Sequence, residues 1–276
     1  MYQEESFRTP QIIYAHTRSD EADMEYKLHC HNSYELYYMI TGNVTYSLEG
    51  KSYRPSPGSL IVIPPDCFHG LQVLDGSEYH RIRVHFVPEL LSEKETAVLL
   101  EPFFKSWCCF EEQFQLEWYF YSLEECGAYG KELQDIAIRA RLLSILAKIF
   151  AICQKGTGIR SGNESQAQEI IRYINQHLKD PLTLEGLAAD FYMSKNHLTS
   201  IFKRATGTTV ARYILYKRMN VARRELTAGA PAAEAALKAG FGDYSSFFRA
   251  YKKLFGCAPT DKNTAALPDM DQSGVF

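Results

Sequence analysis

Three histidines and one glutamate near the N-terminus have a spacing that could bind a ligand. His29 and His31 lie two residues apart, as do Glu35 and Tyr37. Because successive side chains of a β-strand point to opposite faces, residues two apart on a strand share a face. Buried polar side chains are costly unless a ligand, an ion or one another satisfies them, so a small polar molecule is the expected occupant. The predicted ligand-binding residues are His29, His31, Glu35, Tyr37 and His69.

The same residues could hold a metal ion, because three imidazoles and a carboxylate suit iron, nickel, manganese or zinc. The chain reads His29-x-His31-x3-Glu35 with Gly42 following, and then Gly58-x5-Pro64-x4-His69. These runs resemble the two cupin motifs, which implies a small β-barrel. In metal-dependent cupins the matching residues bind one divalent ion from inside the barrel; here they are His29, His31, Glu35 and His69. The chain departs from the pattern at Asp23, where cupins have a glycine.

A second group of polar residues lies on two C-terminal helices that repeat at an interval of 49 residues. Ser194 aligns with Asp243, and Gly207 aligns with Gly256. Each pair supplies a helix N-cap or a helix-terminating glycine. The positions expected to face inward are Leu198, Ile201, Phe202, Phe247, Phe248 and Tyr251. The repeat predicts two similar units, each ending in a helix with one apolar and one polar face.

The outward faces of these two helices suit the major groove of DNA. Short polar side chains near a helix start can reach base edges, and cations one turn later can hold phosphates. We therefore expect sequence-specific binding to double-stranded DNA. The predicted DNA-binding residues are Asn196, Thr199, Ser200, Lys203, Tyr244, Ser245, Ser246, Arg249 and Lys252.

The C-terminal motifs resemble the AraC/XylS family of transcription regulators. The chain reads Leu184-x2-Leu187-Ala188, Met193-Ser194-x3-Leu198-x3-Phe202-Lys203-x3-Gly207, Gly240-Phe241-x-Asp243-x3-Phe247 and Lys252-Lys253-x-Phe255-Gly256-x2-Pro259. The resemblance implies two helix-turn-helix subdomains joined by a long helix, here Val210–Ala228, with recognition helices in successive major grooves. It places the base contacts on the outward residues named above, and it favours activation over repression.

Two departures from the AraC pattern fall in the second unit. Ala232 and Ala235 stand where the family has bulky aliphatic residues, and each smaller side chain gives up on the order of 1 kcal/mol of apolar burial. Lys262 and Asn263 replace an aromatic-basic pair. We therefore expect the first unit to make the stronger DNA contacts.

Three interpretations of the histidine cluster remain open. The residues could line a sensor pocket without a functional metal, as in the sensor domains of AraC-like regulators, which is the expectation we adopt. They could instead support metal-dependent sensing, or catalysis by a metallo-oxygenase. His69, in a proline-rich turn, could also be a surface histidine at the barrel rim. We expect no catalytic residue, no metal and no cofactor.

The charge of the chain is distributed unevenly. Residues 1–163 hold 15 Lys/Arg against 22 Asp/Glu, a net charge of −7, whereas residues 164–262 hold 15 against 9, a net charge of +6. A polyanion is thus expected to bind the second half. The N-terminus lacks the basic start and apolar run of a secretory signal, no membrane span is needed, and the seven cysteines show no Cys-x2-Cys spacing. We expect a cytoplasmic protein.

The element pattern predicts an α+β protein of two domains. Short runs at Tyr34–Ile40, Val44–Leu48, Leu60–Ile63 and Tyr79–Phe86 predict strands of a cupin-type barrel. Lys131–Gln154 predicts a helix whose apolar stripe (Ile136, Ala140, Leu143, Ala147 and Phe150) could pair two subunits or cover the barrel. The expected boundaries are 1–90 for the ligand-sensing barrel, 91–154 for the helical dimerisation segment, 155–163 for a linker, 164–263 for the DNA-binding domain and 264–276 for a tail.

The sequence therefore predicts a transcription regulator that responds to a small-molecule effector. Its expected partners are promoter DNA, RNA polymerase, the effector and a second copy of the chain. Two alternatives remain: a metal-dependent cupin enzyme fused to a DNA-binding module, and a DNA-binding protein without a ligand.

Overall fold

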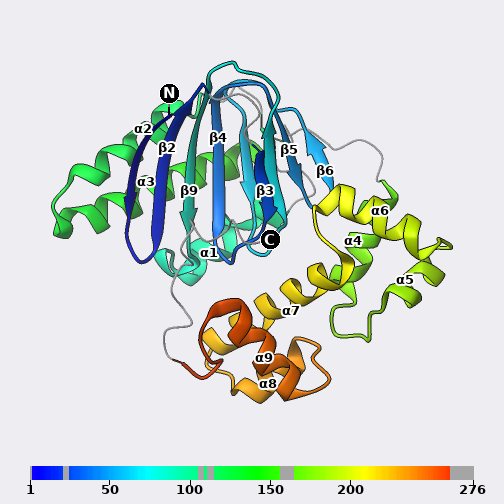
Figure 1. The fold of residues 1–276 in the computed structure, drawn as a ribbon. Helices are drawn as coiled ribbons and strands as arrows, with labels where there is room; N and C mark the ends of the chain where they lie inside the picture. Colours follow the sequence, from blue (N-terminus) through cyan, green and yellow to red (C-terminus); the bar gives the residue numbers. More distant parts are fainter. Residues whose placement is uncertain (1, 21–24, 105–108, 111–114, 156–164, 262–276) are drawn as a thin grey trace. The chain divides into compact units, whose positions relative to one another are not determined.

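The computed structural model describes residues 2–20, 25–104, 109–110, 115–155 and 165–261 (Figure 1). The chain divides into two compact units. The first comprises Met1–Tyr26, Cys30–Leu48 and Ser52–Gly162, and the second comprises Lys27–His29, Glu49–Lys51 and Asn163–Phe276. Most of the predicted linker, 156–163, and the whole tail lie outside the described residues, as do Lys262 and Asn263.

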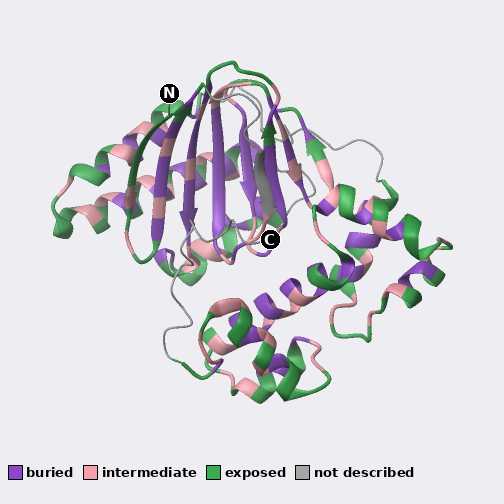
Figure 2. Cartoon of the chain, viewed as in Figure 1, coloured by how far each residue is buried: buried purple, intermediate pink, exposed green. Residues whose placement is uncertain are grey.

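Two antiparallel sheets form the β-barrel of the N-terminal half. One has the strand order β1-β2-β9-β4-β7-β10 and the other β3-β8-β5-β6. The strands are β1 (Tyr2–Arg8), β2 (Ile12–Ser19), β3 (Glu25–His29), β4 (Tyr34–Thr41), β5 (Val44–Leu48), β6 (Lys51–Tyr53), β7 (Leu60–Ile63), β8 (His69–Val73), β9 (Tyr79–Phe86) and β10 (Cys109–Phe110). Figure 2 shows that β4 and β9 are buried along most of their length. The predicted cupin-type barrel is confirmed.

Strand β4 lies between β7 and β9 and has two different faces. Glu35 pairs with Ile63 on β7 and with His85 on β9. Tyr37 faces the opposite sheet, where its ring lies 4.8 Å from that of Tyr46 on β5. Because side chains alternate along a strand, Glu35 and Tyr37 share the inner face of the barrel.

Three helices accompany the barrel: α1 (Glu93–Leu99), α2 (Glu117–Glu124) and α3 (Lys131–Gln154). Short 3-10 turns lie at Pro88–Leu90, Glu101–Phe104 and Glu125–Ala128. Figure 1 shows α2 and α3 along the outer side of the sheet that contains β2 and β9. Phe120 of α2 stacks on Tyr38, an outward residue of β4, with ring centroids 4.8 Å apart. The helices and the outer face of the sheet therefore share one hydrophobic core.

The predicted apolar stripe of α3 is not the face that packs on the barrel. Ile136 is 69% exposed, and Leu143 and Phe150 are partly buried. The buried residues of α3 are Ile138, Leu142, Ile145, Leu146, Ile149, Ile152 and Cys153. At 100° per residue these side chains lie on the opposite side of the helix from the stripe. Ile136, Ala140 and Ala147 of the stripe therefore face outward, whereas Leu143 packs against the shared core.

The C-terminal half is entirely helical in the part that the structure describes. Its helices are α4 (Gln166–Gln176), α5 (Leu184–Asp190), α6 (Lys195–Thr206), α7 (Val210–Thr227), α8 (Ala232–Lys238) and α9 (Tyr244–Phe255). The predicted caps are confirmed: the Ser194 side chain accepts a hydrogen bond from the His197 amide, and the Asp243 side chain accepts one from Ser246. Gly207 and Gly256 end α6 and α9 in the left-handed conformation that favours glycine.

One glycine lies where the turn between α8 and α9 meets the turn after α4. Gly240, between α8 and α9, has φ +87°, and a Cβ atom there would lie 2.4 Å from the carbonyl oxygen of Leu178. Arg218 of α7 donates hydrogen bonds to the carbonyl oxygens of Leu178 and Asp180, at 2.8 and 2.7 Å. The turn after α4 is thus held from two sides. No helix in the described residues is long and apolar enough to cross a bilayer.

Candidate functional sites

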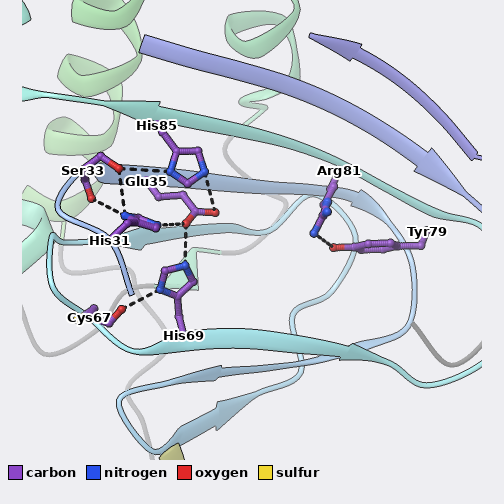
Figure 3. Close-up of polar contacts among 8 residues, drawn as sticks. All are labelled: His31, Ser33, Glu35, Cys67, His69, Tyr79, Arg81 and His85. Atoms are coloured by element: carbon purple, nitrogen blue, oxygen red, sulfur yellow. Dashed lines mark hydrogen bonds and ion pairs between the residues drawn. The ribbon is translucent and has the colours of Figure 1, made fainter. Parts of the chain in front are cut away.

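A cluster of buried ionisable side chains lies between the two sheets of the barrel (Figure 3). Glu35 projects from β4, and His85 projects from the paired position of β9. His69 is the first residue of β8, and His31 lies in the loop between β3 and β4. Each of the four residues is at most 6% exposed.

All three imidazole rings direct Nε2 toward the Glu35 carboxylate. Oε2 of Glu35 lies 3.0 Å from Nε2 of His31 and 2.9 Å from Nε2 of His69. Its other oxygen, Oε1, lies 3.8 Å from Nε2 of His85. The carboxylate is therefore enclosed by ring nitrogens that come from three separate chain segments.

The Nδ1 atoms of the rings are held by the surrounding loops. Nδ1 of His69 lies 2.9 Å from the carbonyl oxygen of Cys67. A carbonyl can only accept, so this nitrogen carries the hydrogen. Nδ1 of His31 lies 3.1 Å from the carbonyl oxygen and 3.0 Å from the hydroxyl of Ser33. The hydroxyl of Ser33 also lies 3.5 Å from Nδ1 of His85, which places it between the two rings.

Burial and neighbouring groups shift the pKa values of Glu35 and of the histidines in the cluster. Burial alone would raise the pKa of Glu35, but His85, His69 and the hydrogen bond from His31 hold it well below its usual range. Burial lowers the pKa of His31 and lowers that of His85 further. The arrangement thus favours an ionised Glu35.

A second cluster of polar side chains lies further along the inner face of the barrel, on β4 and β9. Tyr37 and Tyr79 share a hydrogen bond of 2.7 Å between their hydroxyls, and Nη1 of Arg81 donates to Tyr79 at 3.0 Å. Arg81 is 2% exposed. By strand alternation Arg83 faces the same side as Arg81 and His85. Burial, followed by the charge of Arg81, lowers the pKa of Arg83. The barrel interior is therefore lined with hydrogen-bonding groups over several strand positions.

The outward face of α6 forms a hollow on the surface of the second unit. It is lined by Asn196, Thr199, Ser200, Lys203 and Arg204. The opposite side of the helix is anchored by Leu198 and Phe202, both fully buried. The helix thus offers polar and cationic groups on one face only, as the sequence predicts.

Helix α9 repeats this arrangement. The side chains of Tyr244, Ser245, Ser246, Arg249 and Lys252 are all exposed, and Phe247 and Tyr251 are fully buried. Nη2 of Arg249 lies 3.4 Å from the Ser246 hydroxyl, which keeps the guanidinium along the polar face. Phe248 and Ile201, also expected to face inward, are partly buried.

Family comparisons decide what these two units are. Residues 12–174, more than half of the chain, match the family model described as AraC-like ligand binding domain, and residues 187–264 match a helix-turn-helix domain. The chain belongs to the AraC family. It is thus a transcription regulator with a ligand-binding domain and a helix-turn-helix DNA-binding domain.

Relatives of this AraC-family chain differ in how much of it they cover. A probable transcriptional regulator from Photobacterium leiognathi, LumQ, is 30% identical over 92 residues, which are 33% of this chain and 37% of LumQ. The uncharacterised regulator YbfI of Bacillus subtilis is 22% identical over 79% of each chain. The structure of ToxT from Vibrio cholerae is 12% identical, covers 94% of this chain and all of that chain, and has a TM-score of 0.38.

The structure brings together most of the predicted pocket residues of this AraC-family sensor. His31, Glu35 and His69 converge, and Tyr37 lies on the same inner face as Glu35. His29 ends β3, and its ligand atom lies within 4.8 Å of those of His31 and His69. Their roles as ligand contacts stay predictions.

Two details of the predicted pocket are corrected. His31 does not share a strand face with His29, because β3 ends at His29 and a loop carries His31 inward. His69 is not a surface residue at the rim, since it begins β8 and is 2% exposed. The proline-rich turn ends just before it.

The sequence reasoning missed His85 and Arg81, and in the DNA-binding domain it missed Arg204. A signal for the first two exists, because Tyr79, Arg81, Arg83 and His85 alternate along the predicted strand Tyr79–Phe86. Polar residues at every second position of a strand mark a polar inner face.

Proposed function

We propose that the protein regulates transcription by placing α6 and α9 in successive major grooves of promoter DNA. The observation that supports this proposal best is the hollow over α6, because four of its five lining residues are predicted DNA contacts. The proposed base contacts are Asn196, Thr199, Ser200, Tyr244, Ser245, Ser246 and Arg249, and the proposed phosphate contacts are Lys203 and Lys252. Arg204 joins the phosphate contacts, because it lines the same hollow.

The proposed effector is a small polar molecule with an anionic group, bound in the barrel interior. The inner face of β9 carries Arg81 and Arg83, whereas the acidic residue of β4 is Glu35, which already faces three histidines. The guanidinium groups and tyrosine hydroxyls of this inner face could donate hydrogen bonds to an anionic group and orient it. His29, His31, Glu35, Tyr37 and His69 remain the proposed contacts at the other end of the interior.

The proposed mechanism is a shift between two arrangements of a dimer. A ligand changes such an equilibrium only if it binds one arrangement more tightly than the other. The outward part of the α3 stripe supports pairing of two copies, because Ile136, Ala140 and Ala147 stay exposed in the single chain. We propose that the dimer acts in the cytoplasm and contacts RNA polymerase as an activator. The relatives are named as transcriptional regulators, and we propose no catalytic activity.

DNA binding by the full-length protein tests this proposal. Fluorescence anisotropy is measured with duplexes from the region upstream of its own gene and with random duplexes, over a range of salt concentrations. We expect tighter binding to an upstream duplex, with affinity falling by a log-log slope of about 0.9 for each phosphate contact. No binding to either DNA at low salt would overturn the proposal.

A ligand screen in the same assay tests the effector. The compounds are small mono- and dicarboxylates, sugar phosphates and neutral sugars. We expect an anionic compound to change the affinity for the upstream duplex. Response to neutral sugars alone would contradict the assigned charge of the effector but leave DNA binding in place.

A further inference from the structure

We propose that the barrel binds one divalent transition-metal ion through His31, Glu35, His69 and His85. This inference concerns the same pocket as the proposed effector. It depends on the geometry of the four side chains and holds whether or not the pocket regulates DNA binding.

The Glu35 carboxylate and the rings of His31 and His69 place donor atoms at spacings expected around a single ion. A zinc ion lies about 2.0–2.1 Å from an imidazole nitrogen and about 2.0–2.2 Å from a carboxylate oxygen. Two donors on one such tetrahedral ion are therefore about 3.3 Å apart. The Oε2 atom of Glu35 lies 3.0 and 2.9 Å from Nε2 of His31 and His69. The ligand atoms of His31, Glu35 and His85 all lie within 4.8 Å of one another.

The hydrogen bond to the Cys67 carbonyl oxygen fixes the hydrogen of His69 on Nδ1. In its neutral form, this ring then presents the lone pair of Nε2 to a carboxylate oxygen 2.9 Å away. Two acceptors at that distance repel one another unless a proton or a cation lies between them. Metal-bound histidines commonly donate their other ring N–H to a backbone carbonyl in this way, which orients the metal-binding nitrogen.

His85 provides an independent indication. Its Nε2 is buried and makes no hydrogen bond within the described residues. The nearest carboxylate oxygen, Oε1 of Glu35, is 3.8 Å away, which exceeds hydrogen-bond length. A buried ring nitrogen without a partner is costly, and with the ring hydrogen on Nδ1 an ion between His85 and Glu35 would satisfy Nε2. The ring is 1% exposed, so water has little access to it.

The donor set determines which metals fit. Three imidazole nitrogens and one carboxylate oxygen suit zinc, nickel, iron, manganese or cobalt, whereas calcium and magnesium prefer sites built from oxygen alone.

This set differs by one residue from the set implied by the cupin resemblance. In the set implied by the cupin resemblance, His29 is a ligand and no residue of β9 takes part. Here His85 lies directly across from Glu35 in the sheet, whereas His29 is partly exposed at the end of β3. The two possible sets therefore make opposite predictions for His29 and His85.

Metal binding by the full-length protein without a histidine tag tests the proposal. The protein is treated with a chelator, dialysed and titrated separately with Zn²⁺ and Co²⁺. Bound metal is quantified by elemental mass spectrometry, and Co²⁺ binding is followed by visible absorption. We expect one equivalent of either metal, and Co²⁺ bands typical of nitrogen-rich coordination. Less than a tenth of an equivalent, or no Co²⁺ band, would overturn the proposal without bearing on DNA binding.

Matched histidine variants then identify the ligands. Changing a supporting residue already costs about 10- to 100-fold in metal affinity, so His85→Gln is expected to lose at least that much. His80→Gln is the control, because His80 lies on the same strand and stacks on His16 outside the cluster. His29→Gln is expected to retain its metal. Loss of metal in His29→Gln with retention in His85→Gln would overturn the assigned set. Circular dichroism confirms that each variant is folded.

Discussion

At the scale of single residues, DNA recognition divides between side chains that read bases and side chains that hold phosphates. Asn196 and Arg249 lie on the exposed polar faces of α6 and α9, and Lys252 lies about two turns after the start of α9. A lost base contact costs about 1–3 kcal/mol at one base pair, whereas a lost phosphate contact is independent of sequence.

The first prediction follows from this division. Asn196→Ala and Arg249→Ala should bring the affinity for the upstream duplex closer to that for random DNA. Lys252→Ala should weaken both affinities alike and reduce the salt slope by about 1. Fluorescence anisotropy of the full-length variants measures both quantities. Equal losses on both DNAs for all three variants would contradict the assigned roles.

The second prediction concerns Gly240. In Gly240→Ala the new Cβ atom would meet the Leu178 carbonyl oxygen, in addition to the strain of a positive φ. Gly229→Ala is the matched control, because Gly229 has a similar φ of +89° and no atom within 4 Å of the added Cβ. We expect Gly240→Ala to lower the free energy of unfolding by more than the control, which should itself cost about 1 kcal/mol. Equal losses of unfolding free energy for the two variants, measured by urea denaturation, would show that the turn after α4 can move to make room for the added Cβ.

Residue identities on the inner face could be predicted from local pattern, but their partners could not. Glu35 and His69 follow from spacing and from the cupin resemblance. The pairing of Glu35 with His85 joins strands 50 positions apart, and only the sheet register reveals it. His31 was placed on a strand because alternation was extended past the true end of β3 at His29.

At the scale of elements, helix boundaries were predicted well because the sequence marks them chemically. Ser194, Asp243, Gly207 and Gly256 are caps and terminators with local hydrogen bonds, so no tertiary information is needed. The edge strand β1 was not predicted. Its residues are mostly polar and exposed, and they pair with β2 without the alternation that marks a half-buried strand.

The third prediction concerns the outward stripe of α3. Ile136→Lys places a charge on a side chain that is 69% exposed, so the fold should be unaffected. If the stripe pairs two copies, the variant should sediment as a monomer under conditions where the parent is a dimer. Ala97→Lys, an equal charge change at an exposed position of α1, is the control. An unchanged dimer in Ile136→Lys would locate the interface elsewhere.

At the scale of the whole molecule, the surface charge and the buried ionisable groups lie in different units. The basic surplus belongs to residues 164–262, and the buried ionisable cluster belongs to the barrel. Composition predicts this division, because charge per segment requires no knowledge of the fold. The sequence does not show which face of α3 packs on the barrel, since the helix is apolar on more than one side.

The fourth prediction tests the division between the units. His31→Ala should leave the affinity for DNA in the absence of ligand within about twofold, because the DNA contacts lie in the other unit. It should abolish the thermal stabilisation produced by any compound that stabilises the parent, since such stabilisation requires binding to the folded state. Differential scanning fluorimetry and anisotropy measure the two effects. A variant that responds like the parent, or that loses DNA binding, would remove His31 from the sensor.

The alternation of β4 has a further consequence for how such a sensor could change during evolution. Glu35 and Tyr37 face the interior, whereas Leu36 and Tyr38 face outward, and Tyr38 stacks on Phe120 of α2. Adjacent residues of one strand therefore serve the pocket and the helical layer separately. Substitutions at odd positions can alter what the barrel recognises while the even positions keep the helices in place. Since both sets share one backbone, a ligand that displaces β4 also displaces the residue that supports α2. New ligand specificity can thus arise while the contact between β4 and α2 is kept.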